Sequence, residues 1–195
     1  MSSDCPSREE ALALLTEYTH SESLIKHALA VEAAMRWYAE RGGHDVERWG
    51  VTGLLHDFDY ERWPDPEADG HPYMGNKILT ELNYPEDMRD AIMGHAVYTG
   101  VERKTDMAKT LFACDELTGL ITASVLVRPD KSIHTLTAKS VKKKMKDKAF
   151  AKGVNREDIR IGCEEIGVEV SEHIENVIAS MQAVAEELGL QGTEA

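Results

Sequence analysis

The sequence predicts an all-α fold, organised as a single compact multi-helix domain. Apolar residues recur at helical spacings of three and four along most of its 195 residues. Ser7, which is followed by acids, has the composition of a helix start, and Gly42-Gly43 that of a helix end. No stretch of useful length alternates apolar and polar residues as a strand would, and the length suits one domain with a sizeable core.

Three helices are predicted before residue 58. The first covers residues 9–18 and begins at a serine cap, and the third covers residues 44–55 and closes at His56-Asp57. The second covers residues 21–42 and carries an apolar stripe at helical spacing. This stripe consists of Leu24, Ala28, Val31, Met35 and Tyr38.

A loop and three further helices are predicted between residues 58 and 127. Residues 58–70 combine prolines with several acids, which is typical of a loop. Helices are expected from about His71-Pro72, over residues 85–95 and over residues 106–127. The last of these is long and mostly apolar, and Arg128-Pro129 ends it.

The C-terminal part is predicted to contain a linker, a lysine-rich segment and two helices. Residues 132–137 form the linker, and residues 139–152 hold seven lysines against the single acid Asp147. A short helix follows Asn155, and a last helix is expected from Cys163 to Leu188. The predicted organisation is an N-terminal helix packed on the domain (1–19), a core (20–127), a helical extension (128–188) and a frayed tail (189–195).

The composition narrows the classes of function. Apolar residues make up 42% of the chain and charged residues 29%, as in ordinary globular proteins, and the formal net charge is −13. This charge disfavours nucleic acid or an anionic membrane as the partner, although a small anionic substrate remains compatible with it. Without a long apolar run or a secretory leader, the protein is expected to be cytoplasmic, with three reduced cysteines, two of them in the core.

Four of the eight histidines fall at or near predicted helix ends or on otherwise apolar faces: His27, His56, His71 and His95. Singly, each is compatible with a core, cap or turn position, and His56-Asp57 alone would be typical of a solvated helix end. Asp115, however, lies in the apolar helix of residues 106–127, where a carboxylate is costly to bury unless paired or bound to a cation. Imidazole and carboxylate groups from several helices form metal sites in bundles. The ordered set, rather than any one spacing, indicates such a site.

This ordered set resembles the HD-domain superfamily of metal-dependent phosphohydrolases, and Leu54-Leu55-His56-Asp57 matches its signature doublet. The resemblance covers about residues 20–127 and implies an HD-domain bundle. In that family a first His, the His-Asp pair and a distal Asp bind one metal, which corresponds here to His27, His56, Asp57 and Asp115. Members with two further histidines bind a second metal, which the doublet Asp bridges, and His71 and His95 match those places.

The resemblance implies hydrolysis of a phosphate ester, in a nucleotide or a small phosphometabolite, by a metal-activated water. Asp57 and His56 would lie at the catalytic centre, with Fe, Mn, Ni, Co or Zn, or also Mg, as the ions. Two alternatives stay open. One is oxygen activation by a di-iron pair, in a protein resembling inositol oxygenase, and the other is a non-catalytic module that binds a nucleotide to regulate a partner. The sequence does not determine the oligomeric state.

Two departures from the family patterns bear on the subgroup. Phe58-Asp59 stands where one subgroup has Ile-Gly after the doublet. The branch that cleaves cyclic dinucleotides has a lysine just after the doublet, tandem histidines and a Gly-Tyr-Pro motif. Here the doublet is followed by Asp59, Tyr60, Glu61 and Arg62, and His95 is followed by Ala96. These differences argue against cleavage of cyclic di-GMP.

The lysine-rich segment has two interpretations. It is either a solvated helix face or a phosphate-binding rim, and the spacing of four within two pairs of lysines places each pair on one face. The candidates for phosphate binding are Lys139, Lys142, Lys143, Lys146 and, more weakly, Arg62. The remaining histidines are expected at the surface: His20, His44, His134 and His173.

Overall fold

The computed structural model describes residues 5–192. Within that range the chain is helical and has no strand, apart from an isolated β-bridge between Ser132 and Gln191. The predicted all-α class is confirmed. Every helix in the described range is too short or too polar to cross a lipid bilayer. The helices are α1 (Arg8–Tyr18), α2 (Glu22–Gly42), α3 (Val46–Leu55), α4 (Tyr73–Glu81), α5 (Glu86–His95), α6 (Asp106–Leu126), α7 (Ala138–Lys146), α8 (Arg156–Ile166), α9 (Val170–Gln182) and α10 (Ala185–Leu188), with short 3-10 turns at Pro66–Ala68, Val97–Thr99 and Ile133–Thr135.

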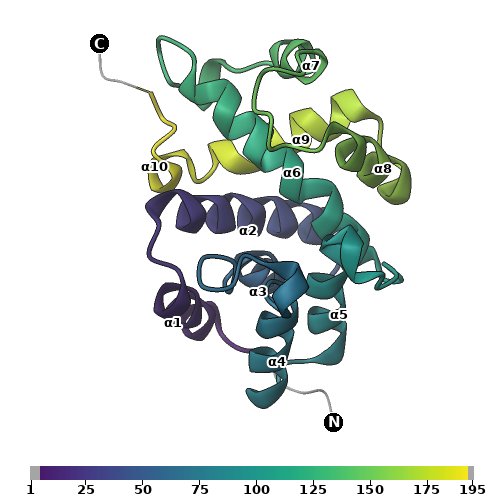
Figure 1. Ribbon diagram of the computed structural model, residues 1–195. Coiled ribbons are helices and arrows are strands. Elements are labelled where there is room, and N and C mark those ends of the chain that lie inside the picture. Colours follow the sequence, from purple (N-terminus) through teal and green to yellow (C-terminus); the bar gives the residue numbers. More distant parts are fainter. Residues whose placement is uncertain (1–4, 193–195) are drawn as a thin grey trace.

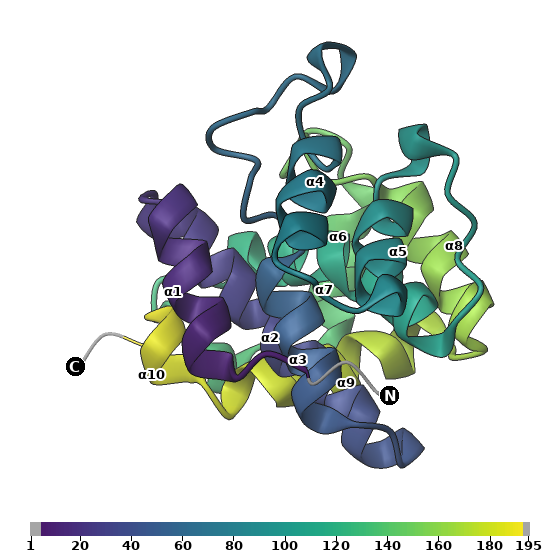
Figure 2. The same ribbon diagram turned by 90° about the horizontal axis from the view of Figure 1, so that it is seen from below.

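Helix α2 lies at the centre of the molecule, between two groups of helices. Figure 1 shows α1, α3, α4 and α5 below it, and α6, α8 and α9 above it. It packs mainly against α3 on one side and against α6 and α9 on the other. Figure 2 looks onto the lower group, in which α1, α3 and α5 lie in that order and α3 contacts both neighbours. Because α5 also packs on α6, the ends of α3 and α5 come close to the middle of α6.

The buried apolar side chains form two clusters that meet at α2 and α6. The lower cluster includes Leu54 of α3 and Met88 of α5. The upper cluster includes Leu117 of α6, and also Cys114 and Cys163, which are buried free thiols as predicted. Side chains of α2 and α6 belong to both clusters, so the two helices are fixed from both sides. Functional groups on them are therefore held in place by most of the core.

Local signals set the predicted helix starts and ends. The Ser7 hydroxyl accepts a hydrogen bond from the Glu10 amide (3.2 Å), and the Glu10 carboxylate accepts one from the Ser7 amide (2.8 Å), which is a capping box. Helix α3 begins after Asp45, whose side chain accepts from the Arg48 amide. It ends at Leu55, so that His56 and the turns after it are free of the regular helical spacing.

One predicted helix is divided in the structure. The segment expected to be helical from Cys163 to Leu188 forms the end of α8, then α9 and α10. Gly167 ends α8 with φ 68°, a left-handed conformation that glycine adopts without steric penalty. A second break at Ala183-Val184 separates α9 from α10. The prediction of one continuous helix is wrong, because the apolar periodicity continues across positions where the backbone turns.

Two further predictions for the C-terminal region are wrong. Leu190, expected in a frayed tail, is only 2% exposed, and its carbonyl accepts a hydrogen bond from the Ile133 amide (2.8 Å). The part of the expected tail at residues 193–195 lies outside the described residues. His173, expected at the surface, is fully buried on α9. His20, His44 and His134 are exposed, as predicted.

His173 is buried because each of its ring nitrogens has a partner. Its Nε2–H donates to the Ala113 carbonyl of α6 (2.8 Å), and its Nδ1 accepts from the Tyr38 hydroxyl of α2 (2.6 Å). The Asn176 side-chain amide donates in turn to the Tyr38 oxygen (3.3 Å). This arrangement suits a neutral imidazole, and burial lowers the pKa of His173 below its usual value.

Replacement of His173 by Gln is expected to flatten the loss of stability on acidification. With its folded-state pKa lowered, His173 stays neutral in the folded protein while the unfolded chain takes up a proton below about pH 6.5. Its contribution is therefore complete above that pH and is lost as the pH falls, by up to about 1.4 kcal/mol per pH unit. Urea unfolding of both proteins between pH 7.5 and 5 measures the difference, in which the other histidines cancel. Parallel curves would contradict the prediction.

Candidate metal centre

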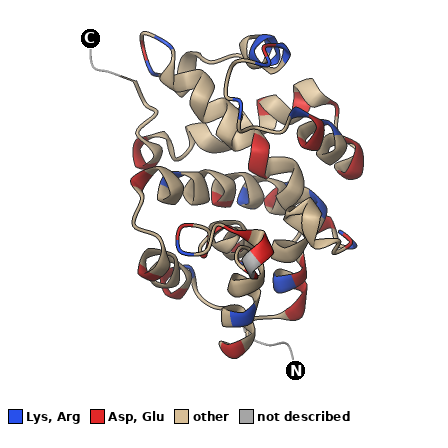
Figure 3. Ribbon diagram, viewed as in Figure 1, with Lys and Arg blue, Asp and Glu red and all other residues tan. Residues whose placement is uncertain are grey.

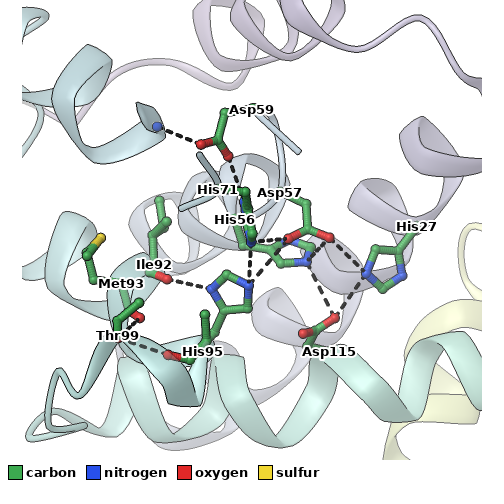
Figure 4. A network of polar contacts seen from close by, with 12 residues as sticks. His27, His56, Asp57, Asp59, His71, Ile92, Met93, His95, Thr99 and Asp115 are labelled. Carbon is green, nitrogen blue, oxygen red and sulfur yellow. Dashed lines mark hydrogen bonds and ion pairs between the residues drawn. The ribbon is translucent and has the colours of Figure 1, made fainter. Parts of the chain in front are cut away.

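Six side chains from separate parts of the chain converge where α2, α3, α5 and α6 meet (Figure 4). They come from α2, from the two residues that follow α3, from the segment before α4, from the last residue of α5 and from the middle of α6. The structure thus brings together every member of the predicted ordered set: His27, His56, Asp57, His71, His95 and Asp115.

The carboxylate of Asp57 divides the cluster into two halves. Its Oδ1 lies 3.3 Å from Nε2 of His71 and 3.3 Å from Nε2 of His95. Its Oδ2 lies 3.4 Å from Nε2 of His56 and 3.8 Å from Nε2 of His27. Asp115 belongs to the second half, because its Oδ1 is 3.0 Å from His27 and 3.5 Å from His56. A single carboxylate therefore faces two groups of imidazoles, one with each oxygen.

The imidazoles of His56, His71 and His95 are oriented by acceptors outside the cluster. Nδ1 of His56 lies 2.8 Å from the Gly53 carbonyl, Nδ1 of His71 lies 2.7 Å from Oδ1 of Asp59, and Nδ1 of His95 contacts the Ile92 carbonyl. Because these oxygens can only accept, each Nδ1 carries the hydrogen and each Nε2 presents a lone pair. Metal-binding histidines in proteins typically have this outer contact.

Nδ1 of His27 also faces an acceptor, which is the hydroxyl oxygen of Thr118. Thr118 donates its hydroxyl hydrogen to the Asp115 carbonyl (2.8 Å), and its oxygen lies 3.4 Å from Nδ1 of His27. The oxygen is then available as the acceptor for His27 Nδ1–H. When the four imidazoles are neutral, their Nε2 atoms therefore direct lone pairs at one another and at carboxylate oxygens.

Such a cluster suits a bound cation. Nε2 of the fully buried His56 has no hydrogen-bond partner, and Nε2 of His71 lies 3.3 Å from Nε2 of His95. Two ligand atoms at about 2.1 Å from an ion and at right angles to each other are about 3.0 Å apart. Most distances in both halves are close to this value, and nitrogen and carboxylate oxygen suit divalent transition metals. The residues therefore fit one ion in each half, between which Asp57 would bridge.

The charges of the histidines and aspartates in the cluster shift one another's pKa values. Burial disfavours a charge on His56, but the carboxylates of Asp57 and Asp115 outweigh it and raise the pKa of His56 well above its usual value. Burial likewise opposes ionisation of both aspartates, yet the neighbouring histidines hold the pKa of Asp57 and of Asp115 well below the usual range. The carboxylates are thus ionised at neutral pH, and a metal would compete with protons on the imidazoles.

Sequence reasoning missed the role of Asp59. This buried carboxylate accepts from His71 Nδ1 through Oδ1 and from the Gly75 amide through Oδ2 (2.6 Å). A Cβ atom at position 75 would lie 2.9 Å from the Asp59 carboxylate, so only glycine fits there without displacement. In the sequence Asp59 is one of several acids in a loop, and nothing local separates it from its exposed neighbours.

Asp59→Asn is expected to weaken metal binding by about 10–100-fold, the range found when an outer partner of a ligating histidine is removed. The substitution keeps the size of the side chain but loses the charge that polarises His71, and it places an amide NH2 against His71 or against the Gly75 amide. Competition with a chromophoric chelator gives the affinity. Asp69→Asn, in the same loop but exposed, is the matched control. Equal affinities for both variants would contradict this role.

The structure does not bring the predicted phosphate-binding cations to the cluster. The four lysines lie on α7 and line a separate groove of about 740 Å³, where Lys142 donates to Ser171 of α9 (2.7 Å). Figure 3 shows this basic helix above α6, at the far side of α2 from α3 and α4. Arg62 is engaged elsewhere, with the Glu17 carbonyl (2.6 Å) and the Tyr18 ring.

Comparison with known proteins identifies the family. The family model of the HD domain matches residues 24–120, a range that contains all six converging residues. The chain belongs to the HD-domain superfamily, whose members are typically metal-dependent phosphohydrolases. No curated protein and no solved structure matches the sequence.

Proposed function

We propose that this HD-domain protein hydrolyses a phosphate ester of a small molecule, such as a nucleotide or a phosphometabolite, with two divalent ions. One observation supports the proposal most strongly. The Nε2 atoms of four imidazoles and three carboxylate oxygens converge on one point, and the two oxygens of Asp57 divide them into two sets. His27, His56 and Asp115 would hold one ion, and His71 and His95 the other.

The side chains of the cluster would hold the ions in place and leave one side open to the phosphate group. A bound divalent metal lowers the pKa of a water molecule to about 7 and neutralises phosphoryl charge. His56, His71 and His95 are nearly fully buried and hold fixed positions, whereas the side chains of His27, Asp57 and Asp115 are 21–22% exposed. The phosphate group would approach this exposed side. Hydrolysis forms a bond between phosphorus and the water oxygen and breaks the ester bond, and the released alcohol takes up a proton.

The test is metal analysis of the purified protein, followed by a phosphatase screen. We expect about two ions of Fe, Mn, Ni, Co or Zn per chain, an increase in melting temperature on addition of metal to the stripped protein, and release of phosphate from one class of ester. The screen covers nucleotides, sugar phosphates and aryl phosphates, with Mg²⁺ as an alternative ion.

Two results would overturn the proposal. A protein that binds none of these ions and gains no thermal stability from them would be a non-catalytic module of the HD fold. A protein that contains iron, consumes oxygen with a candidate substrate and releases no phosphate would instead be a di-iron oxygenase. Oxygen consumption is therefore measured on the same preparation as phosphate release.

A further inference from the structure

A groove of about 760 Å³ adjoins the metal centre and shares His27 with it. It lies between the first turns of α2, the second half of α6 and residues 188–190 at the end of α10. Figure 1 shows these three segments together at the left of the molecule, where α10 lies against the start of α2. The groove is distinct from the lysine-lined groove of α7 and has no residue in common with it.

The groove continues the faces of α2 and α6 that carry the metal centre. On α6, Gly119, Thr122 and Leu126 follow Asp115 at spacings of four, three and four, and all three line the groove. On α2, Ser23 precedes His27 by four residues and also lines it. Side chains at these spacings lie on one helix face. A ligand whose phosphate reaches the centre can therefore extend along both helices into the groove.

The exposed side chains of the metal centre also indicate that a ligand would enter from the side of His27. His27, Asp57 and Asp115 are its three partly exposed side chains, while the other three are at most 6% exposed. His27 also lines the groove. The accessible part of the centre and the groove thus meet at His27.

The lining of the groove is mostly apolar. Small side chains of α6 leave the space open, since the Cβ position of Gly119 has only Val154 nearby, at 3.9 Å. Leucines form the walls: Leu24, Leu126, Leu188 and Leu190. Among the described lining residues the one lysine, Lys26, is paired with Glu22 (2.6 Å). A second phosphate or a carboxylate on the ligand would find no unpaired lysine or arginine among these residues, whereas an apolar group would leave water.

We propose that this groove binds the leaving alcohol of a phosphate monoester, and that this alcohol is uncharged and largely apolar. The inference rests on the proposed phosphohydrolase function and specifies its substrate class. The groove would favour such monoesters over polyphosphates and over esters whose alcohol carries a further anionic group. The phosphate lies at the metal centre, and the alcohol lies in the part of the groove next to His27, between Thr122 of α6 and the start of α2.

Binding of non-hydrolysable phosphonates to the metal-loaded protein tests the groove independently of turnover. 1-Naphthylmethylphosphonate and methylphosphonate carry the same anionic group, so their dissociation constants, measured by calorimetry, differ by the contribution of the naphthyl ring. We expect the naphthyl compound to bind at least about tenfold more tightly, from burial of apolar surface. We also expect benzylphosphonate to bind more tightly than 4-carboxybenzylphosphonate.

Two variants locate the effect. Ala123→Leu fills the groove from α6. Thr122→Glu adds a negative charge at a partly exposed position of the lining, two helical turns from Asp115, so it should fold even if the first variant does not. Both should abolish the preference for the naphthyl compound and leave the affinity for methylphosphonate and the metal content unchanged. Ala13→Leu, at an exposed position of α1 outside the groove, is the matched control and should keep the preference.

The outcomes separate the two proposals. Equal affinities of the wild type for the naphthyl compound and methylphosphonate, tighter binding of the carboxylated compound, or an unchanged preference in Thr122→Glu would overturn the groove assignment. Release of phosphate from esters in the screen would in that case leave the phosphohydrolase intact. Conversely, a preference that both variants abolish, in a protein that hydrolyses no ester, would support the groove and overturn the hydrolase.

Discussion

Asp57→Ala is expected to abolish metal uptake and phosphatase activity together. Asp57 is the one member of the cluster that faces both sets of histidines, through Oδ1 at 3.3 Å from His71 and His95 and through Oδ2 at 3.4 Å from His56. Its removal takes a ligand from both proposed ions. The loss of metal affinity should therefore exceed the factor of about 10–100 that is typical when an outer partner of a ligand is removed. Metal content by elemental analysis and phosphate release by a colorimetric assay give the two values.

The matched control for this variant is Glu67→Ala, which removes an exposed carboxylate from the loop that follows. It should keep full metal content and activity, and circular dichroism should show that both variants remain helical. The prediction fails if Asp57→Ala retains metal at the level of the wild type, because the carboxylate would then not join the two halves of the cluster.

His71→Ala is expected to halve the metal content, from two ions per chain to one. Nε2 of His71 lies near Oδ1 of Asp57 and Nε2 of His95 (both 3.3 Å), in the half of the cluster away from Asp115. The other half, built from His27, His56 and Asp115, keeps its ligands. We expect phosphatase activity to fall by at least about 100-fold, since the lost ion would supply part of the charge neutralisation at the phosphoryl group.

His20→Ala is the control for this second variant, because His20 is an exposed histidine outside the cluster. It should keep both ions. Unchanged metal content in His71→Ala would contradict the two-metal arrangement, and loss of both ions would show that the halves are not independent. Together with Asp57→Ala, the experiment distinguishes a bridging carboxylate from a ligand of one ion.

The sequence predicted the helical class, most helix boundaries and the order of the six converging residues. Boundaries such as those at Ser7 and Leu55 follow from local capping and turn formation, which depend on neighbours within a few positions. The set from His27 to Asp115 was singled out because its order resembles that of the HD-domain ligands, and because imidazoles and a carboxylate near helix ends or on apolar faces need partners. The family match over residues 24–120 confirms that the chain contains an HD domain.

The features that the sequence did not predict depend on contacts between distant segments. Asp59 acquires its role from His71 and from the close approach of Gly75, and neither contact changes the local pattern around it. His173 is buried because Tyr38 and Ala113, more than fifty positions away, satisfy both of its nitrogens. Residue type alone is compatible with a histidine at the surface as well as with one in the core.

The position of the lysine-rich segment relative to the metal centre could also not be predicted from the sequence. Its sequence indicated a solvated face or a phosphate-binding rim, and a single helix is compatible with both. Packing of α7 on α9 and α6 directs the lysines to a groove of their own, while the apolar groove beside His27 has no sequence signal beyond small residues in α6.

The sequence by itself thus determined the helices and the order of the candidate metal ligands along them, because residue type and helix formation are local properties. Only the tertiary structure decided how Asp57 divides its two oxygens, which acceptors orient the imidazoles, and that His27 lies both in the centre and at an apolar groove. These features arise from the packing of α2, α3, α5 and α6 around one point, and packing is set by all the helices together.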